Sequence, residues 1–543
     1  MNKRVALRLM GVAVAISGLA GCGQSSSANQ EQSKALNVTM ASEMQTADPN
    51  KATDAYSGYM MKQTTEGLYR LNNRGQVVAG MATKVVKPTN QGKTYTLTLR
   101  HDAKWSNGDA VTAQDFVTSF RRQVDPTTKA QYANRFASFK NYAAVQNGKK
   151  QPSALGVKAL GKYKLQITLS QLNPSFNYEA ATEYLPVNRK LVKKYGAKYG
   201  TNSDRVAANG PYVLKKWNGT KTTWEYVKNP KYYAAKSVRL KQINVQVVKD
   251  SSTAEKLFAA GKVQETAISG SAVPGVKNNA KLAKQLRTTL TTAVSLQYFN
   301  QQNRLGANAN FRKAANVALN REQLTQKVNQ DGSKPLLNLV AQGVTTDPNN
   351  GNQDFAVSTG NYTKHNDAQA KRLWAKAKKE LGGGNQTINL LSNDTDGSKN
   401  VAEYIQSQWE KDMPGLKVTI TAVPLQQEIN KMFKQNFDVA MFGWTGDEPD
   451  PTNNLNLLEK GNSINFSNYN DRQYNQLMTR ATQETNTKKR MALLKQANRR
   501  GMQLGIFNPL YQQSQVNLVS DKVGGIHYST YNLAAQYRYA YWK

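Results

Sequence analysis

The chain has 543 residues, more than one hydrophobic core usually supports, so we expect two or three packed lobes. Its single cysteine excludes an intramolecular disulfide or a cysteine zinc cluster, and its three histidines are too far apart in the sequence to form a His-Glu-x-x-His metal motif. The net charge of +37 would suit an anionic partner, but the basic residues are spread along the chain without a long run, which favours a solvated surface and argues against nucleic-acid binding.

The N-terminus has the layout of an export signal. Basic residues precede an apolar stretch over Leu9–Ala20, which is shorter than a membrane-spanning helix requires. The stretch leads into the sequence Leu-Ala-Gly-Cys, ending at Cys22, which resembles the lipobox of bacterial lipoproteins. By that resemblance residues 1–21 are a signal peptide, and Cys22 carries a lipid that anchors the chain on the outer face of the cell membrane, as on a Gram-positive cell. Residues 22–34 are small and polar, which predicts a flexible tether.

The first part of the folded body predicts mixed α+β structure. Apolar and polar residues alternate over Lys93–Arg100 and again over Lys162–Ser170, as they do in half-buried strands. Between these strands, Thr112–Asp115 has the Thr-x-x-Asp pattern of a capping box, which predicts the start of a helix that buries Phe116 and Phe120.

Strands and helices alternate after residue 385. The predicted elements are a strand over Thr387–Leu391, a helix over Asn400–Met413, a strand over Lys417–Val423, a helix over Gln426–Phe433 and a strand over Phe437–Phe442. This alternation predicts a parallel sheet, in which ligands bind beyond the carboxyl ends of the strands. The loops predicted at that edge are Ser392–Lys399 and Gly443–Pro451. The Gly- and Lys-rich segment Lys376–Asn385 is predicted to be a surface loop.

Several sequence blocks point to one known family. In chain order they are Lys104–Arg122, which begins Lys-Trp-Ser-Asn-Gly-Asp; Asn209–Tyr212 with Asn229–Tyr233; Phe311–Ala314 with Ala318–Arg321; and Phe437–Val439 with Gly443–Trp444. Together they resemble the family-5 extracellular solute-binding proteins, and among these the oligopeptide receptors of ATP-binding-cassette importers. The resemblance extends over nearly the whole chain after Cys22.

The resemblance implies an α/β, three-lobed periplasmic-binding-protein-like fold of class II, with two α/β lobes joined by a hinge and an inserted α+β lobe. Lobe I would comprise 35–66, 187–292 and 511–543, the inserted lobe II 67–186, and lobe III 293–510. The implied ligand is an extended oligopeptide whose backbone pairs with protein strands. The implied partner is a transmembrane permease, and we expect a monomer without a cofactor.

Matching positions suggest which residues touch the peptide. Asp447 matches a carboxylate that receives the α-amino group of the peptide in a charge-assisted hydrogen bond; the alternative is an acidic residue in a turn. Gly443, Trp444 and Thr445 would offer backbone groups to the ligand. Trp444 would also wall a side-chain pocket, unless it is a buried core residue.

Further candidates come from other parts of the chain. Tyr132 matches a tyrosine that reaches the ligand from the inserted lobe, with packing at the lobe surface as the alternative. Thr53 and Asp54 match a segment along the peptide, and Asp54 would replace a glutamate that the family often has at the position of Thr53. Receptors for short peptides can carry Arg and His where this chain has Met441 and Ser398. We therefore expect no clamp on the peptide carboxylate and binding of longer peptides.

Other functions fit the sequence less well. An enzyme is disfavoured because a Gly-x-Ser-x-Gly elbow, a histidine triad and a phosphate loop are all absent from the sequence. A receptor for a specific signalling or pheromone peptide is the closest alternative, since it would share the groove. A nickel or sugar receptor of the same architecture, and an adhesin activity as a secondary role, also stay open.

Overall fold

The computed structural model describes residues 35–543 except 74, 174, 271, 447–448 and 529–534. The predicted signal peptide, the tether, Cys22 and Asp447 therefore lie outside the described residues. Among the residues that are described, none of the helices combines the length and the apolar character needed to cross a membrane.

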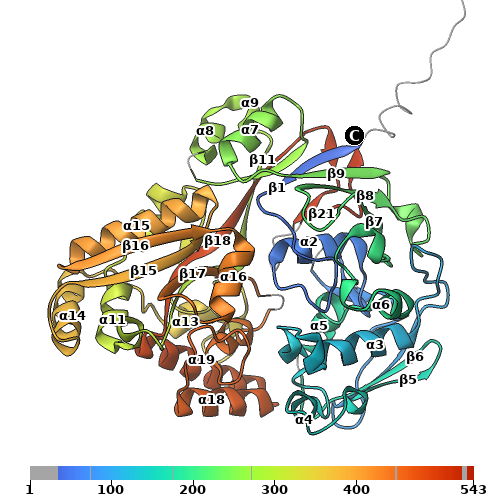
Figure 1. Cartoon of the computed structure of the whole chain (residues 1–543), viewed down its shortest axis with the longest axis horizontal. Helices are drawn as coiled ribbons and strands as arrows, with labels where there is room; N and C mark the ends of the chain where they lie inside the picture. Colours follow the sequence, from blue (N-terminus) through green and yellow to red (C-terminus); the bar gives the residue numbers. More distant parts are fainter. Residues whose placement is uncertain (1–34, 74, 174, 271, 447–448, 529–534) are drawn as a thin grey trace, which may run out of the picture.

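An eleven-stranded mixed sheet runs through the molecule (Figure 1). In spatial order its strands are β16 (Leu416–Val423), β15 (Gln386–Asn393), β17 (Val439–Trp444), β11 (Leu286–Phe299), β18 (Phe507–Val519), β10 (Glu265–Ile268), β1 (Leu36–Met40), β9 (Gln242–Val247), β8 (Thr223–Lys228) and β7 (Tyr212–Lys215), with β12 (Lys334–Pro335) paired to β18. The long strands β11 and β18 are antiparallel and join the two halves of the sheet.

One half of the sheet is built from β1 and β7 to β10. Strand β1 pairs in parallel with β9 and β10, and its apolar residues Leu36 and Val38 are fully buried in a core that also contains Trp217, Trp224 and Tyr226. The helices of this half are α2 (Ala55–Thr64), α7 (Ser251–Ala259), α8 (Ala272–Asn278) and α9 (Ala280–Ala283), whereas α6 (Arg189–Tyr195) packs through Leu191 against the core of the third region described below. The C-terminal residues return to this half in the short strands β19 (Val523–Gly524), β20 (His527–Tyr528), β21 (Ala535–Gln536) and β22 (Tyr541–Trp542).

The other half contains the predicted parallel strands. Strand β15 pairs in parallel with both β16 and β17, which confirms the prediction from the alternating pattern after residue 385. The helices of this half are α10 (Arg304–Ala307), α11 (Ala309–Val317), α12 (Arg321–Gln323), α13 (Phe355–Thr359), α14 (Asp367–Glu380), α15 (Asp396–Asp412), α16 (Leu425–Phe433), α17 (Thr452–Leu455), α18 (Arg472–Gln483) and α19 (Thr487–Leu504), with the short strands β13 (Thr346–Asp347) and β14 (Gln353–Asp354). Two hydrophobic clusters form its core.

A third region has a separate core. It contains β2 (Tyr69–Leu71), β3 (Val77–Ala79), β4 (Thr94–Thr98), β5 (Val157–Gly161), β6 (Lys164–Thr168), α3 (Ala113–Val124), α4 (Tyr142–Gln146) and α5 (Phe176–Thr182). Strands β4, β6 and β5 form an antiparallel sheet, so the two strands predicted from period-two alternation are confirmed. The aromatic rings of Phe120, Phe136, Phe139 and Tyr184 pack together beneath it. Each such pair typically adds about 0.5–1.5 kcal/mol beyond its buried area.

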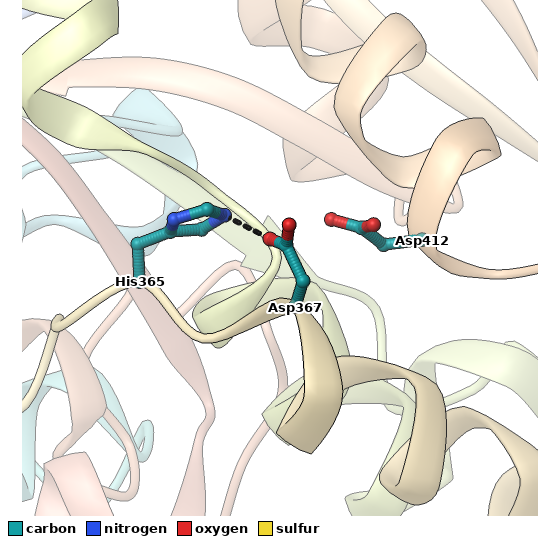
Figure 2. A group of neighbouring side chains, drawn as sticks. All are labelled: His365, Asp367 and Asp412. Carbon is teal, nitrogen blue, oxygen red and sulfur yellow. Dashed lines mark ion pairs between the residues drawn. The ribbon is translucent and has the colours of Figure 1, made fainter.

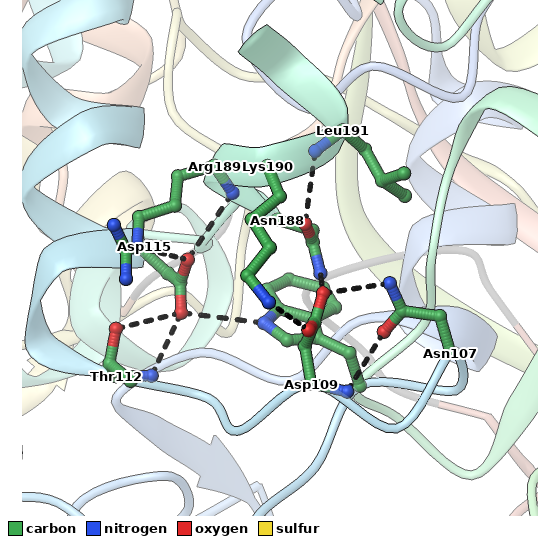
Figure 3. Close-up of polar contacts among 9 residues, drawn as sticks. Asn107, Asp109, Thr112, Asp115, Asn188, Arg189, Lys190 and Leu191 are labelled. Carbon is green, nitrogen blue, oxygen red and sulfur yellow. Dashed lines mark hydrogen bonds and ion pairs between the residues drawn. The ribbon is translucent and has the colours of Figure 1, made fainter. Parts of the chain in front are cut away.

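The block Lys104–Arg122 attaches this third region to α6 (Figure 3). As predicted, α3 begins with a capping box in which Thr112 N donates to Asp115 Oδ2 at 2.8 Å. Asp115 Oδ1 also accepts a hydrogen bond from Arg189 N at 3.2 Å, and Asp109 Oδ1 pairs with Lys190 Nζ at 2.5 Å. The polar residues of this block therefore hold two elements together.

Several predicted boundaries change in the structure. The loop expected over Ser392–Lys399 is mostly regular, because β15 runs to Asn393 and α15 begins at Asp396. Gly443 and Trp444 are the last residues of β17 and do not belong to the following loop. The segment Lys376–Asn385 is not a continuous surface loop, because α14 extends to Glu380 and buries Ala377. Local composition does not reveal where a helix is extended by tertiary packing.

The lobe limits expected after residues 292 and 510 fall within the two long strands. Register shifts between β11 and β18 occur from Leu290 to Val294 and from Ser295 to Leu296. Such irregularities bend a strand and increase its local twist. The lobe limits themselves stay a prediction.

Candidate functional site

A cavity of about 620 Å³ lies where the two halves of the sheet and the third region meet. This volume is within the roughly 300–1,000 Å³ of typical small-molecule sites. Its walls come from α2 and the residues before it, from the ends of β10 and β17, from the middle of β18, from the first turn of α15 and from the C-terminal segment.

The structure brings the described candidate residues together around this cavity. Those that line it are Thr53, Asp54, Tyr132, Ser398, Met441, Gly443, Trp444 and Thr445. They come from widely separated parts of the sequence, and the carboxyl-end edge of β15 and β17 faces the cavity, as expected for a parallel sheet. Asp447 lies outside the described residues, two positions beyond Thr445.

The end of β17 presents both backbone and an aromatic ring. Trp444 is half-buried and packs against the core cluster of its half of the sheet. It also lines the cavity, so it is both a core residue and a part of the cavity wall. Its indole Nε1 is buried and has no hydrogen-bond partner among the described residues. A buried N–H without a partner is costly, and a ligand that reached this group would relieve that cost.

Tyr132 connects three parts of the molecule. It lies in the third region, belongs to the core cluster of the half that contains β17, and its hydroxyl donates to the backbone oxygen of Thr53 at 3.0 Å. The Arg135 guanidinium lies 4.6 Å from its ring centroid. The side chain is 8% exposed, so Tyr132 offers the cavity mainly a wall of ring atoms.

Asp54 has a structural task in addition to facing the cavity. It is the N-cap of α2, where its Oδ1 accepts a hydrogen bond from Ser57 N at 2.7 Å. Its Oδ2 is buried without a partner among the described residues. Burial raises the pKa of this carboxyl group, against the lowering effect of its hydrogen bonds from Ser57. Asp54 therefore lines the cavity as a carboxyl group that burial makes harder to ionise.

Ser398 lies in the first turn of α15 in an acidic setting. Its Oγ accepts a hydrogen bond from Thr395 Oγ1 at 3.0 Å. The carboxylate of Asp394 is close by and pairs with Lys249 Nζ at 3.3 Å, and Lys249 also pairs with Glu43 at 3.4 Å. The helix N-terminus would attract an anion, but the surrounding carboxylates oppose one.

Glu265 is a site residue that the sequence reasoning missed. It is 4% exposed, lines the cavity, and its two oxygens accept hydrogen bonds from Tyr528 and Tyr537, each at 3.0 Å. Burial raises its pKa to about 7, against the lowering effect of both tyrosines. An acidic residue within the otherwise strand-like sequence Gln264–Ile268 was the available signal, because a charge is seldom placed inside a buried strand.

A second missed group joins the start and the end of the chain. Glu66 accepts hydrogen bonds from Tyr232 and Tyr233, at 2.5 and 2.6 Å, and pairs with Arg538 at 3.1 Å. Glu66 and Arg538 line the cavity. Their separation in the sequence left no local pattern that could reveal the pair.

Comparison with known proteins places this geometry in context. The chain is 30% identical over 552 residues to the dipeptide-binding protein of Lactococcus lactis subsp. cremoris, covering 98% of each chain. It is 35% identical to the structure of Listeria monocytogenes OppA bound to peptide, with a TM-score of 0.88 over 94% of this chain and 99% of that one. It is 31% identical to the pheromone receptor PrgZ, with a TM-score of 0.89 and coverage of 94% and 99%.

Two structures of one further relative indicate the conformation. Against one structure of the Escherichia coli murein tripeptide-binding protein MppA, which is 27% identical, the TM-score is 0.84 with 93% of this chain and 98% of that chain covered. Against the unliganded open form of MppA, at the same 27% identity and with 93% and 97% covered, it falls to 0.63. The described conformation therefore differs from that open form in the placement of its parts.

A family model also matches most of the chain. The model for bacterial extracellular solute-binding proteins, family 5, middle region, matches residues 76–466. This span contains β3 to β6 and α3 to α5 of the third region, the attachment of its capping box to α6, and strands β10 and β17, whose ends line the cavity. The chain belongs to family 5 of the bacterial extracellular solute-binding proteins.

Proposed function

We propose that this chain is an extracellular receptor that encloses an oligopeptide in the cavity and delivers it to an ATP-binding-cassette permease. The observation that carries the proposal is the cavity itself, into which strand ends and buried carboxylates converge. The relatives whose names or titles mention dipeptides, a bound peptide or a pheromone support the same ligand class.

An extended peptide suits the unpaired strand edges. Strand β17 pairs with β15 only at Val439 and Ala440 among the described residues, so Met441–Trp444 keeps one backbone edge without a strand partner. On the other side, β10 pairs with β1 only at Glu265, which leaves Thr266–Ile268 with a similar edge. A peptide that adds to such edges is held through backbone groups that every peptide possesses, which favours tolerance of sequence.

Asp447 is our candidate for the peptide amine. Thr445, two residues earlier, lines the cavity. A hydrogen bond to a charged group is worth about 1.5–3 kcal/mol, so we expect Asp447→Asn to weaken binding of a free peptide roughly tenfold to a hundredfold, measured by calorimetry. The same peptide with an acetylated N-terminus should bind both proteins equally, and Asp521→Asn at an exposed position serves as control. Equal affinity of both proteins for the free peptide would refute the role of Asp447.

Peptide length is a separate test. Met441 and Ser398 both line the cavity, and the carboxylate of Asp394 lies beside the first turn of α15. A peptide carboxylate gains little there, so we expect affinity to persist for peptides beyond three residues in a calorimetric length series. Because the Lactococcus relative is named for dipeptides, a sharp loss of binding beyond two or three residues would place this chain in that narrower class and remove the prediction.

Anchoring and organisation complete the proposal. We infer that Cys22 is lipidated and holds a monomeric receptor at the membrane, with residues 22–34 as a tether, 35–66, 187–292 and 511–543 as lobe I, 67–186 as lobe II and 293–510 as lobe III. Two acyl chains give stable anchoring where one is marginal. In the native cell, Cys22→Ser should release the protein from the membrane fraction into the medium, and retention of the variant would contradict lipid anchoring.

A signalling peptide is the second candidate ligand. The similarity to the pheromone receptor PrgZ favours it. Mass spectrometry of material eluted from the purified protein separates the two roles, because a nutritional receptor should yield mixed peptides and a signalling receptor a single species.

A further inference from the structure

Three potential metal-ligating side chains meet on the half of the molecule that contains α14 and α15, away from the cavity (Figure 2). His365 precedes α14, Asp367 is the first residue of that helix, and Asp412 is the last residue of α15. One ligand atom from each of the three lies within 4.8 Å of the others. The imidazole Nε2 of His365 pairs with Asp367 Oδ1.

Asp412 is the observation that points to a ligand. Its side chain is fully buried, and its carboxylate lies against that of Asp367 without a hydrogen bond from any N–H group in the part of the chain that the structure describes. Figure 2 shows its carboxylate directed at Asp367. Asp412 is also the last residue of a 17-residue helix, and the partial negative charge at that helix end further destabilises the ionised carboxylate. A buried carboxylate in this setting requires a cation or a proton.

The neighbouring lysines do not meet this requirement. Lys411 Nζ lies 3.5 Å from Asp367 Oδ2, and its side chain is 58% exposed. Lys371, within α14, acts on Asp412 only through longer-range attraction. Neither lysine hydrogen-bonds the oxygens of Asp412, so no lysine ammonium neutralises this carboxylate by direct contact.

We propose that His365, Asp367 and Asp412 bind a divalent transition-metal ion, with Zn²⁺ as the best match. An imidazole nitrogen with two carboxylate oxygens is a common ligand set for Zn²⁺, whereas Ca²⁺ and Mg²⁺ prefer oxygen ligands alone. Water would complete the coordination. The ion would fasten the start of α14 to the end of α15, which makes it a structural site separate from the peptide cavity.

The experiment is a Zn²⁺ titration of the metal-stripped full chain without a polyhistidine tag, followed by calorimetry and thermal unfolding. We expect the wild type to bind Zn²⁺ and to gain melting temperature. His365→Gln and Asp412→Asn should each weaken Zn²⁺ binding by roughly tenfold or more, because each removes one of three ligands. His101→Gln, a substitution of an exposed histidine in the third region, should behave as the wild type.

The controls make the result specific. Without metal, Asp412→Asn should be at least as stable as the wild type, because it removes an uncompensated buried carboxylate. Mg²⁺ and Ca²⁺ at the same concentration should not replace Zn²⁺. If the wild type does not bind Zn²⁺, or if both variants bind it as tightly as the wild type, the site is wrong and the two carboxylates share a proton instead.

Discussion

At the scale of single residues, the cavity is notable for carboxylates taken out of water. Asp54 and Glu265 face it, and in both cases burial raises the pKa, for Glu265 to about 7. A buried carboxylate destabilises the ligand-free protein, and a positively charged ligand beside it reduces that destabilisation. Raised pKa values in a cleft are typical of functional sites.

The raised pKa of Glu265 gives a stability prediction with a definite sign. Between about pH 4.5 and 7 the folded protein keeps a proton on this group that the unfolded chain has lost, so its contribution to stability falls as the pH rises. Glu265→Gln removes this titration. Its free energy of unfolding relative to wild type should therefore increase across that window, by at most about 3 kcal/mol.

Urea unfolding at pH 5 and pH 7.5 measures the effect. Glu322→Gln, on an exposed residue, is the matched control and should show no such trend. Parallel pH profiles for wild type and Glu265→Gln would show that the carboxylate is not held protonated.

At the scale of elements, capping and strand ends determine how the third region is attached. The carboxylate of Asp115 closes the capping box of α3, accepts from Trp105 Nε1 at 3.4 Å and accepts from the backbone of Arg189. Thus the residues that carry the family resemblance at Lys104–Arg122 hold α3 and α6 in place and do not line the cavity.

Removing this carboxylate should loosen the attachment. Asp115→Ala leaves several buried donors without an acceptor, and we expect a loss of about 2–3 kcal/mol in the free energy of unfolding. Denaturant unfolding monitored by tryptophan fluorescence measures it, and Asp102→Ala at an exposed position is the control. A difference below about 0.5 kcal/mol, the usual range of surface substitutions, would contradict the structural role of Asp115.

At the scale of the whole molecule, polar contacts between residues far apart in the sequence hold the parts together. Asn134 of the third region donates to Asn462 Oδ1 at 2.9 Å and accepts from Ser463 Oγ at 3.2 Å, and Lys249 reaches Asp394 from the other half of the sheet. The lower similarity to the open form of MppA suggests that such contacts belong to a closed arrangement. Hinge closure around a ligand is a common mechanism among binding proteins.

Weakening these contacts should favour opening. Asn134→Ala removes two neutral hydrogen bonds, worth together about 1–2 kcal/mol, so we expect roughly fivefold to twentyfold weaker peptide binding, mainly through faster dissociation. Small-angle scattering should show a larger radius of gyration for the ligand-free variant. The exposed Asn278→Ala is the control. If Asn134→Ala leaves both affinity and radius unchanged, the contact does not stabilise the closed form.

Local patterns in the sequence determined much of this protein. Period-two alternation identified β4 and β6, a capping box identified the start of α3, and alternating elements identified the parallel strands β15 to β17, because these signals depend on neighbouring residues. Sequence blocks identified the family, and the alternation of strands and helices identified the sheet edge that lines the cavity. Only the tertiary structure decided that Glu265 lines the cavity and accepts hydrogen bonds from two distant tyrosines. It also decided that the Tyr132 hydroxyl donates to the backbone oxygen of Thr53 and that Asp412 is buried beside His365. These arrangements join residues tens to hundreds of positions apart, and the burial and partners of such residues arise when the chain folds, so no local pattern records them.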